Sequence, residues 1–189
     1  MGGGLAILQH IRVKEIVIPE TLKEEFIKTD FLQYALQEEL HITAMQAGDG
    51  WKIGGNQFYV LHPHEKMSDS NENSLVLLAK INELKWLFTG DIGEEGERAL
   101  LEKYPNLKAD VLKAGHHGSK TSSSPYFLDQ IDAKVVVISA GYNNRFGHPH
   151  PEVLSAYSER NMRIYRTDEQ GAITYSYFGD IGTFSSALP

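Results

Sequence analysis

Short apolar runs and amphipathic segments alternate along the whole chain. Runs rich in β-branched and aromatic residues predict strands at 14–19, 41–47, 57–61, 74–81, 84–91, at the start of 109–119 and at 134–141. Apolar residues about four positions apart predict helices over 22–40, 94–104, 124–131 and 151–160. A glycine-rich turn is expected over 48–55 and a final hairpin over 163–178. This alternation with short links predicts an α/β fold with a layered sheet.

Composition narrows the class of protein. With 189 residues, 41% of them hydrophobic and 23% charged, the chain is expected to form a single globular domain over residues 1–189. The chain has no cysteine, so any metal site must use His, Asp, Glu or Asn side chains. A net charge of −7 argues against a broad basic surface for nucleic acid, but it is compatible with an enzyme that meets phosphodiesters only in a metal-lined cleft.

Side chains that could bind metals or phosphates follow three of the predicted strands. Asp91 comes directly after the apolar segment LFTG. His116 and His117 follow the next strand and lie between two glycines, and Asn144 and His148 lie in the loop after the strand that comes next. Ligand sites in open α/β sheets lie beyond the carboxyl ends of the strands, so we expect these side chains to share one site.

A carboxylate and several imidazoles at such an edge are typical of hydrolytic metal chemistry. The carboxylate bridges two divalent ions, the imidazoles complete their coordination, and the pKa of a bound water falls from about 15.7 to about 7. Two metals about 3.5–4 Å apart suit phosphodiester cleavage. The structural alternatives are a turn or helix N-cap for Asp91, an ordinary loop position for His148 and a turn for Asn73. We interpret the segment 62–64, His-Pro-His, as a surface loop.

Taken in order, several motifs resemble a known family. They are N-S-L-V-L-L, L-F-T-G-D-I, A-D-V-L-K-A-G-H-H-G-S-K-T-S, V-I-S-A-G-Y-N-N-R-F-G-H-P-H-P and I-Y-R-T-D-E-Q-G-A-I. Together they resemble the metallo-β-lactamase-like domain at the C-terminal end of ComEC, the membrane channel protein of bacterial natural competence. The resemblance runs from about Gly3 to Gly171 and is most specific between Asn73 and Pro149.

The resemblance implies a partial αββα sandwich with a dinuclear site for Zn or Mn, and a nuclease role in degrading the DNA strand that is not imported. It implies that Asp91 is catalytic and bridges the metals, and that one of His116 and His117 is a further metal ligand. It also implies that His148 is catalytic, as a proton donor or phosphate contact. Three more residues match substrate-binding positions that line the cleft: Asn73, Ser119 and Asn144.

The sequence departs from the family at its main metal motif. The motif H-x-H-x-D-H-x-G-G is expected upstream of the first helix, but the sequence does not contain it. We therefore expect this chain to be the portion of the domain that follows that motif and the opening strands. Asp91 with one or both of His116 and His117 cannot make a tight metal site, so we expect weak or no metal binding and little nuclease activity. An uncovered sheet edge would favour a homodimer.

The resulting hypothesis is a metal-dependent hydrolase domain, a nuclease or phosphodiesterase that acts on single-stranded DNA during competence uptake. Its partner would be the membrane channel part of the same polypeptide. The alternatives are a phosphoester hydrolase of the same fold with another substrate, and a non-catalytic remnant or interaction module. The intact protein is expected in the bacterial cell membrane, with this portion as a soluble domain, because no apolar run approaches the roughly 20 residues of a membrane-spanning helix.

Overall fold

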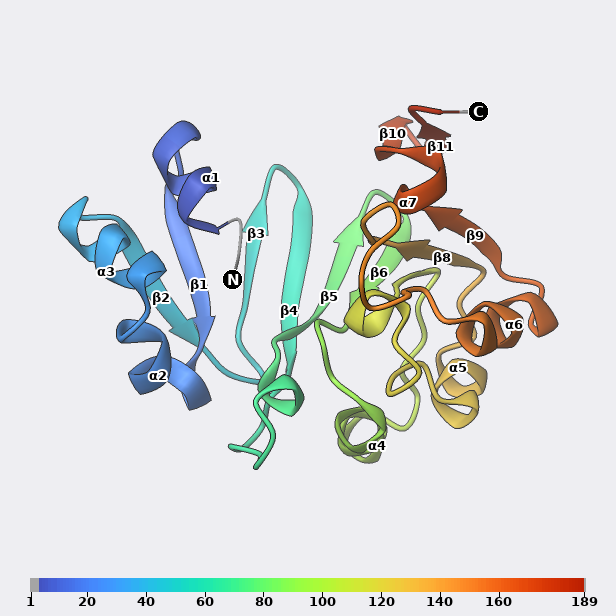
Figure 1. Cartoon of the computed structure of the whole chain (residues 1–189), viewed down its shortest axis with the longest axis horizontal. Coiled ribbons are helices and arrows are strands. Elements are labelled where there is room, and N and C mark those ends of the chain that lie inside the picture. Colours follow the sequence, from blue (N-terminus) through green and yellow to red (C-terminus); the bar gives the residue numbers. More distant parts are fainter. Residues whose placement is uncertain (1–3, 189) are drawn as a thin grey trace.

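A seven-stranded mixed sheet forms the centre of the protein (Figure 1). The computed structural model describes residues 4–188. The strands are Gly50–Ile53 (β3), Asn56–His62 (β4), Val76–Ile81 (β5), Leu84–Phe88 (β6), Val111–Lys113 (β7), Val135–Ile138 (β8) and Arg163–Arg166 (β9). They lie in the order β3-β4-β5-β6-β7-β8-β9. Pairing is antiparallel from β3 to β6 and parallel from β6 to β9.

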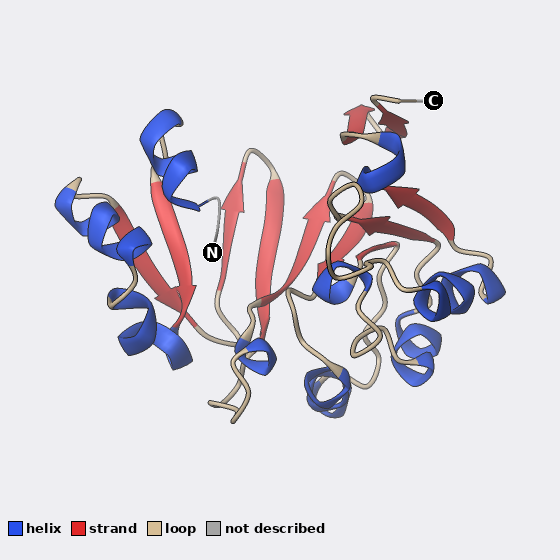
Figure 2. Ribbon diagram, viewed as in Figure 1, coloured by secondary structure: helices blue, strands red, loops and turns tan. Residues whose placement is uncertain are grey.

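Three helices gather on one side of this sheet (Figure 2). They are Glu94–Lys103 (α4), Pro125–Ile131 (α5) and Pro151–Glu159 (α6). Because side chains alternate between the two faces of a strand, every second residue of β6, β7 and β8 points towards the helices. Leu87, Leu112 and Val136 are fully buried in this way. They share one core with Leu100 of α4 and Phe127 of α5.

A separate hairpin packs against residues of the opposite face. The hairpin consists of Ile173–Phe178 (β10) and Ile181–Ser186 (β11), and the short helix Thr167–Gln170 (α7) precedes it. The rings of Tyr175 and Phe184 lie 5.1 and 5.5 Å from the ring of Trp86, centroid to centroid. The predicted hairpin over 163–178 is therefore wrong, because β9 pairs in parallel with β8 and β10 pairs with β11. Packing on Trp86 buries aromatic surface that a hairpin at the sheet edge would expose.

The first part of the chain forms a small unit with its own core. Its elements are Gly4–His10 (α1), Glu15–Pro19 (β1), Glu20–Leu22 (η1), Lys23–Ile27 (α2), Asp30–Gln37 (α3) and His41–Met45 (β2). The strands β1 and β2 pair in parallel, and Ile18 packs with Leu32 in the buried centre. The single helix predicted over 22–40 is divided, because the Thr29 hydroxyl accepts a hydrogen bond from the Leu32 N–H and starts α3 there.

The glycine-rich segment 48–55 contains a strand that the sequence analysis did not predict. This strand, β3, forms an antiparallel hairpin with β4, and Trp51 stacks on Phe58 with 5.1 Å between the ring centroids. The turn between the strands uses Gly54 and Gly55 at φ values of +55° and +86°, which glycine adopts without strain. The glycines therefore make the turn of a hairpin, and the residues before them complete the sheet.

The α/β prediction is confirmed, and the layers are consistent with an α/β sandwich. The helices predicted over 94–104, 124–131 and 151–160 are confirmed to within one residue at each end. Within residues 4–188, no helix is both long and apolar enough to cross a membrane. Because β6, β7 and β8 run in parallel, the loops that follow them leave the sheet at one edge, and these loops carry most of the candidate residues.

Candidate functional site

The turn after β6 positions Asp91 at the edge of the sheet. Gly90 adopts φ +58°, and a Cβ atom there would lie 2.6 Å from the Cβ of Ser74, so the turn requires glycine. The Asp91 N–H donates to the Ser74 hydroxyl over 3.1 Å, which fixes the backbone of this residue. The helix α4 begins only after Gly93, so Asp91 is not its N-cap. The partly buried carboxylate of Asp91 is therefore not used to start the helix.

The strand β7 leads into the 3-10 segment Gly115–Gly118 (η3), which carries the two adjacent histidines. The His116 N–H donates to the Gly90 carbonyl over 2.9 Å, so this segment lies against the turn that carries Asp91. His116 and His117 have φ values of 44° and 60°, in the left-handed region. This conformation costs a residue with a side chain roughly 1–2 kcal/mol. Such strain concentrates at functional sites, which favours a functional role for the pair.

The loop after β8 brings His148 to the same place. The His150 N–H donates to the Gly118 carbonyl over 3.0 Å, which docks this loop on η3. The His148 ring centroid lies 5.8 Å from that of His116 and 4.8 Å from that of His150. Burial lowers the pKa of His148, the neighbouring histidines lower it further, and the Asp91 carboxylate raises it. The structure therefore brings His148, His116 and Asp91 together within electrostatic range.

Asn144 and Ser119 use their polar groups within their own loops. The Asn144 amide donates to the backbone carbonyls of Gly141 and His148, and its Oδ1 accepts from the His148 N–H over 3.0 Å. Ser119 is buried, and its hydroxyl lies 3.0 Å from that of Thr121. Both residues lie in the loops that carry the histidines, and their present contacts hold those loops in shape.

Asn73 organises the loop between β4 and β5 from a buried position. Its amide donates to the carbonyls of Met67 (2.9 Å) and Asp69 (2.6 Å), and its Oδ1 accepts from the Met67 N–H (2.9 Å). The preceding Glu72 carboxylate accepts from two backbone N–H groups at the start of α4. The following Ser74 is the residue that binds the Asp91 N–H. Asn73 thus supports the backbone next to the Asp91 turn.

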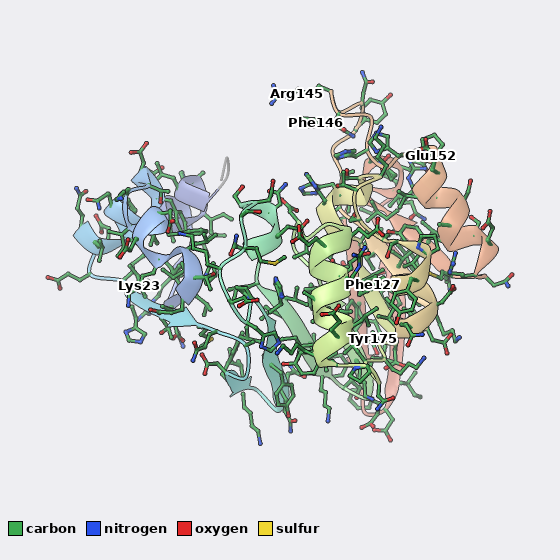
Figure 3. The ribbon with its side chains drawn as sticks, turned by 90° about the horizontal axis from the view of Figure 1, so that it is seen from below. Lys23, Phe127, Arg145, Phe146, Glu152 and Tyr175 are labelled. Atoms are coloured by element: carbon green, nitrogen blue, oxygen red, sulfur yellow. The ribbon has the colours of Figure 1, made fainter. Side chains whose placement is uncertain are left out.

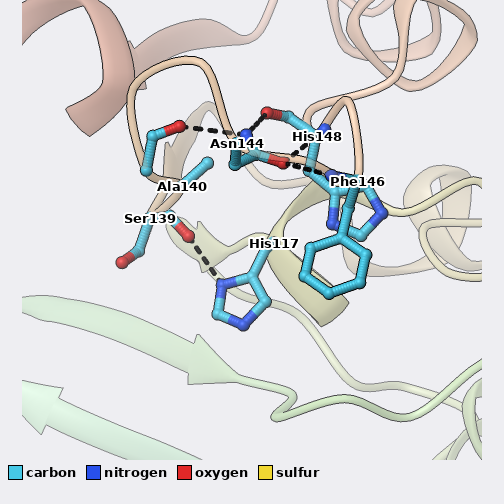
Figure 4. Close-up of a pocket in the computed structure, with 7 residues that line it drawn as sticks. His117, Ser139, Ala140, Asn144, Phe146 and His148 are labelled. Carbon is cyan, nitrogen blue, oxygen red and sulfur yellow. Dashed lines mark hydrogen bonds between the residues drawn. The ribbon is translucent and has the colours of Figure 1, made fainter. Parts of the chain in front are cut away.

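A cavity of about 390 Å³ lies beside the histidines, with His117, Phe146 and His148 among its lining residues (Figure 4). The Nδ1 atom of His117 lies 2.7 Å from the carbonyl oxygen of Ser139, which assigns the proton of the neutral ring to Nδ1. Phe146 stacks on His148 with 5.8 Å between the ring centroids. The sequence analysis did not single out Phe146 or Ser139, although an aromatic residue within a polar loop was an available signal.

Comparison with known proteins supplies the family. ComE operon protein 3 of Bacillus subtilis is 41% identical over 190 residues, which cover 100% of this chain. Competence protein ComA of Neisseria gonorrhoeae is 37% identical over 145 residues, and Recombination protein 2 of Haemophilus influenzae is 33% identical over 143. This chain belongs to the ComEC family. It spans only 24%, 21% and 18% of the lengths of these three relatives. No protein-family model matches the sequence.

The candidate metal ligands among the described residues do not form a complete set. Within residues 4–188, no three side chains of the types His, Asp and Glu are arranged so that they could hold one metal ion. Zinc sites in proteins use three or four protein ligands. Asp91, His116 and His117 therefore do not fit, by themselves, the dinuclear site that the family resemblance implies.

Lys113, which the sequence analysis did not single out, ends the strand that leads into the histidine segment. Its ammonium group donates to the carbonyl of Ala114 over 2.8 Å at the end of β7. Burial lowers the pKa of Lys113, and the Asp91 carboxylate raises it. The signal in the sequence was a lysine that ends an apolar strand shortly before the histidine pair.

His62 is buried, so the prediction of a surface loop is wrong for this residue. Its side chain is 2% exposed, and its Nε2 atom lies 2.7 Å from the carbonyl oxygen of Glu72. The strand β4 extends further than predicted and pairs His62 with Val76 of β5. Burial lowers the pKa of His62. The residue thus belongs to the sheet and to the support of the loop that follows it.

Proposed function

We propose that this ComEC-family chain supplies part of a metal-dependent nuclease site that acts on DNA during competence uptake. The observation that carries the proposal is the convergence of Asp91, His116 and His148 at the ends of neighbouring parallel strands. A carboxylate with imidazoles is a donor set that hydrolytic phosphodiesterases use. The relatives named as competence and recombination proteins favour DNA over other phosphoesters as the substrate.

The proposed metal ligands are Asp91 and one of His116 and His117, with Zn or Mn as the metal. Because the described donors do not complete a metal site, we expect tight binding only when further ligands are supplied, and little activity from the chain alone. His148 is the proposed proton donor or phosphate contact. Its ring lies against His116, and its pKa responds to the charge of Asp91.

The proposed partners follow from the size and edges of the chain. Single-stranded DNA is the proposed substrate, and the channel part of the same polypeptide is a proposed partner, since this chain spans at most 24% of the three relatives' lengths. The strand β3 lies at one end of the seven-stranded sheet, so one of its sides has no partner strand among the residues that the structure describes. Open edges of this kind pair with other chains, and we propose a homodimer through β3.

The test of the nuclease proposal is a chimera in which this chain replaces the matching region of the Bacillus subtilis ComE operon protein 3. We expect the purified chimera to cleave a labelled single-stranded oligonucleotide in the presence of Mn²⁺. Asp91→Asn should lower the rate by about 100-fold or more, because even residues outside the first coordination shell are worth 10–100-fold. Asp180→Asn, which changes an exposed carboxylate at the hairpin tip, is the matched control and should leave the rate unchanged.

Three results would contradict this assignment. A chimera that does not cleave DNA would refute the nuclease function. Equal rates for the chimera and its Asp91→Asn variant would refute the site. Faster cleavage of a small phosphoester such as p-nitrophenyl phosphorylcholine than of DNA would favour a hydrolase with another substrate.

A further inference from the structure

Two exposed aromatic rings and a guanidinium group lie on the loop that follows β8. Tyr142 is 87% exposed and Phe146 is 61% exposed. The guanidinium carbon of Arg145 lies 4.7 Å from the ring centroid of Phe146, which is a cation–π contact. Arg145 and Phe146 project from the body of the protein at the end of this loop (Figure 3). Exposed aromatic rings with arginine beside them are the groups on which the bases of single strands stack.

Hydrogen bonds of one side chain, Asn144, hold the loop in shape. The Asn144 side chain donates to the Gly141 carbonyl over 2.9 Å at the start of the loop. Its Oδ1 accepts from the N–H groups of Phe146 (3.2 Å) and His148 (3.0 Å) at the other end. The backbone that carries the Phe146 ring is thus fixed. A preorganised loop loses less conformational entropy when it binds a ligand, so the fixed shape of this loop favours tight binding.

The Phe146 ring also lies next to the candidate site. It lines the cavity of about 390 Å³ together with His117 and His148 (Figure 4). A base that stacks on Phe146 would take the place of the Arg145 guanidinium over the ring, which would free that guanidinium for the phosphate, while His148 stays stacked on Phe146. This arrangement serves a ligand that has both a flat aromatic face and a negative charge, which is the chemistry of a nucleotide.

We propose that Tyr142, Arg145 and Phe146 form a stacking subsite for the bases of single-stranded nucleic acid, next to the Asp91 site. This inference rests on the proposed function and specifies how its substrate is held. A single strand is required because the bases of a duplex stack on each other and do not present a free face. A net charge of −7 gives little general attraction for the phosphate backbone, so contacts to the bases have to supply most of the affinity.

The experiment measures binding of this chain to two fluorescent probes by anisotropy, without added metal. One probe is a thymidine oligonucleotide of about 12 residues, and the other is an abasic oligonucleotide of the same length. Phe146→Ala and Tyr142→Ala remove the two rings, and Phe146→Trp keeps a stacking face. The matched controls are Tyr126→Ala and Phe178→Ala, which remove rings of similar exposure elsewhere, at 62% and 92%.

Each of Phe146→Ala and Tyr142→Ala should weaken binding of the thymidine probe about fivefold or more and leave binding of the abasic probe unchanged. Phe146→Trp and both controls should match the wild-type chain. The inference is overturned if the wild-type chain does not bind the thymidine probe, or if it binds both probes equally. It is also overturned if Phe146→Ala behaves like Tyr126→Ala.

The outcome is separate from that of the nuclease test. A chain that passes the binding test, while its chimera fails to cleave DNA, retains the stacking subsite and loses the proposed nuclease function. A chimera that cleaves DNA, while Phe146→Ala binds the thymidine probe normally, retains the nuclease function and loses the subsite. Because binding is measured without metal, incomplete metal ligation does not affect the first result.

Discussion

The buried carboxyl group of Glu97 should make the stability of this protein fall as the pH rises towards neutrality. Glu97 lies on α4 and is 2% exposed. It accepts hydrogen bonds from the backbone N–H groups of Ser123 and Ser124 at the start of α5. The Ser123 hydroxyl in turn lies 2.7 Å from the Tyr157 hydroxyl on α6. Burial raises the pKa of Glu97 from 4.5 to about 7, although these hydrogen bonds oppose the rise.

The sign and size of the effect follow from proton linkage. Between pH 4.5 and about pH 7, Glu97 is protonated in the native protein and ionised in the unfolded chain. The native state then holds the extra proton, so the free energy of unfolding decreases as the pH rises. At about 1.36 kcal/mol per pH unit, the whole window corresponds to about 3 kcal/mol. The contribution is complete below the unfolded pKa and is lost above the native pKa.

Urea unfolding at about pH 5, 6, 7 and 8 measures this effect. Glu97→Gln cannot ionise, so the difference in unfolding free energy between the wild-type protein and this variant should shrink by about 2 kcal/mol from pH 5 to pH 7. Glu97→Gln should also carry a cost of about 1–3 kcal/mol that does not change with pH, since its amide nitrogen would face a backbone N–H. Glu95→Gln, on an exposed residue of the same helix, should keep the wild-type slope.

The refuting result is a pair of parallel curves. If the wild-type protein and Glu97→Gln lose stability at the same rate between about pH 5 and pH 7, then the carboxyl group of Glu97 does not hold its proton in the native state. A different slope for Glu95→Gln would show that general surface charge, and not burial, sets the pH dependence.

Four further outcomes are expected. Isothermal titration of this chain with Mn²⁺ or Zn²⁺ should show no stoichiometric sub-micromolar binding, and tight binding would contradict the incomplete ligand set. Glu72→Ala should lower the unfolding free energy by about 1–3 kcal/mol, because the N–H groups of Gly93 and Gly96 at the start of α4 lose their acceptor, whereas Glu83→Ala in an exposed turn should change it little. His116→Gly should raise stability by up to about 1 kcal/mol by relieving the left-handed backbone, and a marked loss would refute the strain. Sedimentation at tens of micromolar should detect a dimer, and a monomer throughout would exclude pairing through β3.

Most of the fold could be predicted because its elements have strong local patterns. The helix α6 begins with proline after a loop, and the strand β8 is a run of β-branched residues, so each is visible without tertiary information. The prediction failed where a tertiary contact decides the pairing. The aromatic residues of β10 could pair beside β9 or fold onto the sheet, and only the position of Trp86 on the opposite face selects the second arrangement.

The residues that converge at the candidate site could be predicted from the sequence, but the residues that surround them could not. Parallel strand ends meet at one edge, so the convergence of Asp91 with His116 and His148 follows from topology. The contributions of Lys113 and Phe146 were missed because a lysine in a strand and an aromatic residue in a loop are common in any sequence. Their significance depends on which charge or cavity lies beside them, and only the three-dimensional structure contains that information.

The hydrogen bonds divide the candidate residues into two groups. The amides of Asn73 and Asn144 bind backbone groups of their own loops, so a substrate could use them only by breaking contacts that keep those loops folded. The histidines show the opposite arrangement, since the backbone of His116 and His117 is held in an unfavourable conformation while the rings lie beside a cavity or a neighbouring ring. The left-handed backbone of His116 and His117 directs the two imidazoles to positions that an unstrained turn would not give them. The histidines, rather than the asparagines, are therefore the residues expected to meet the substrate directly.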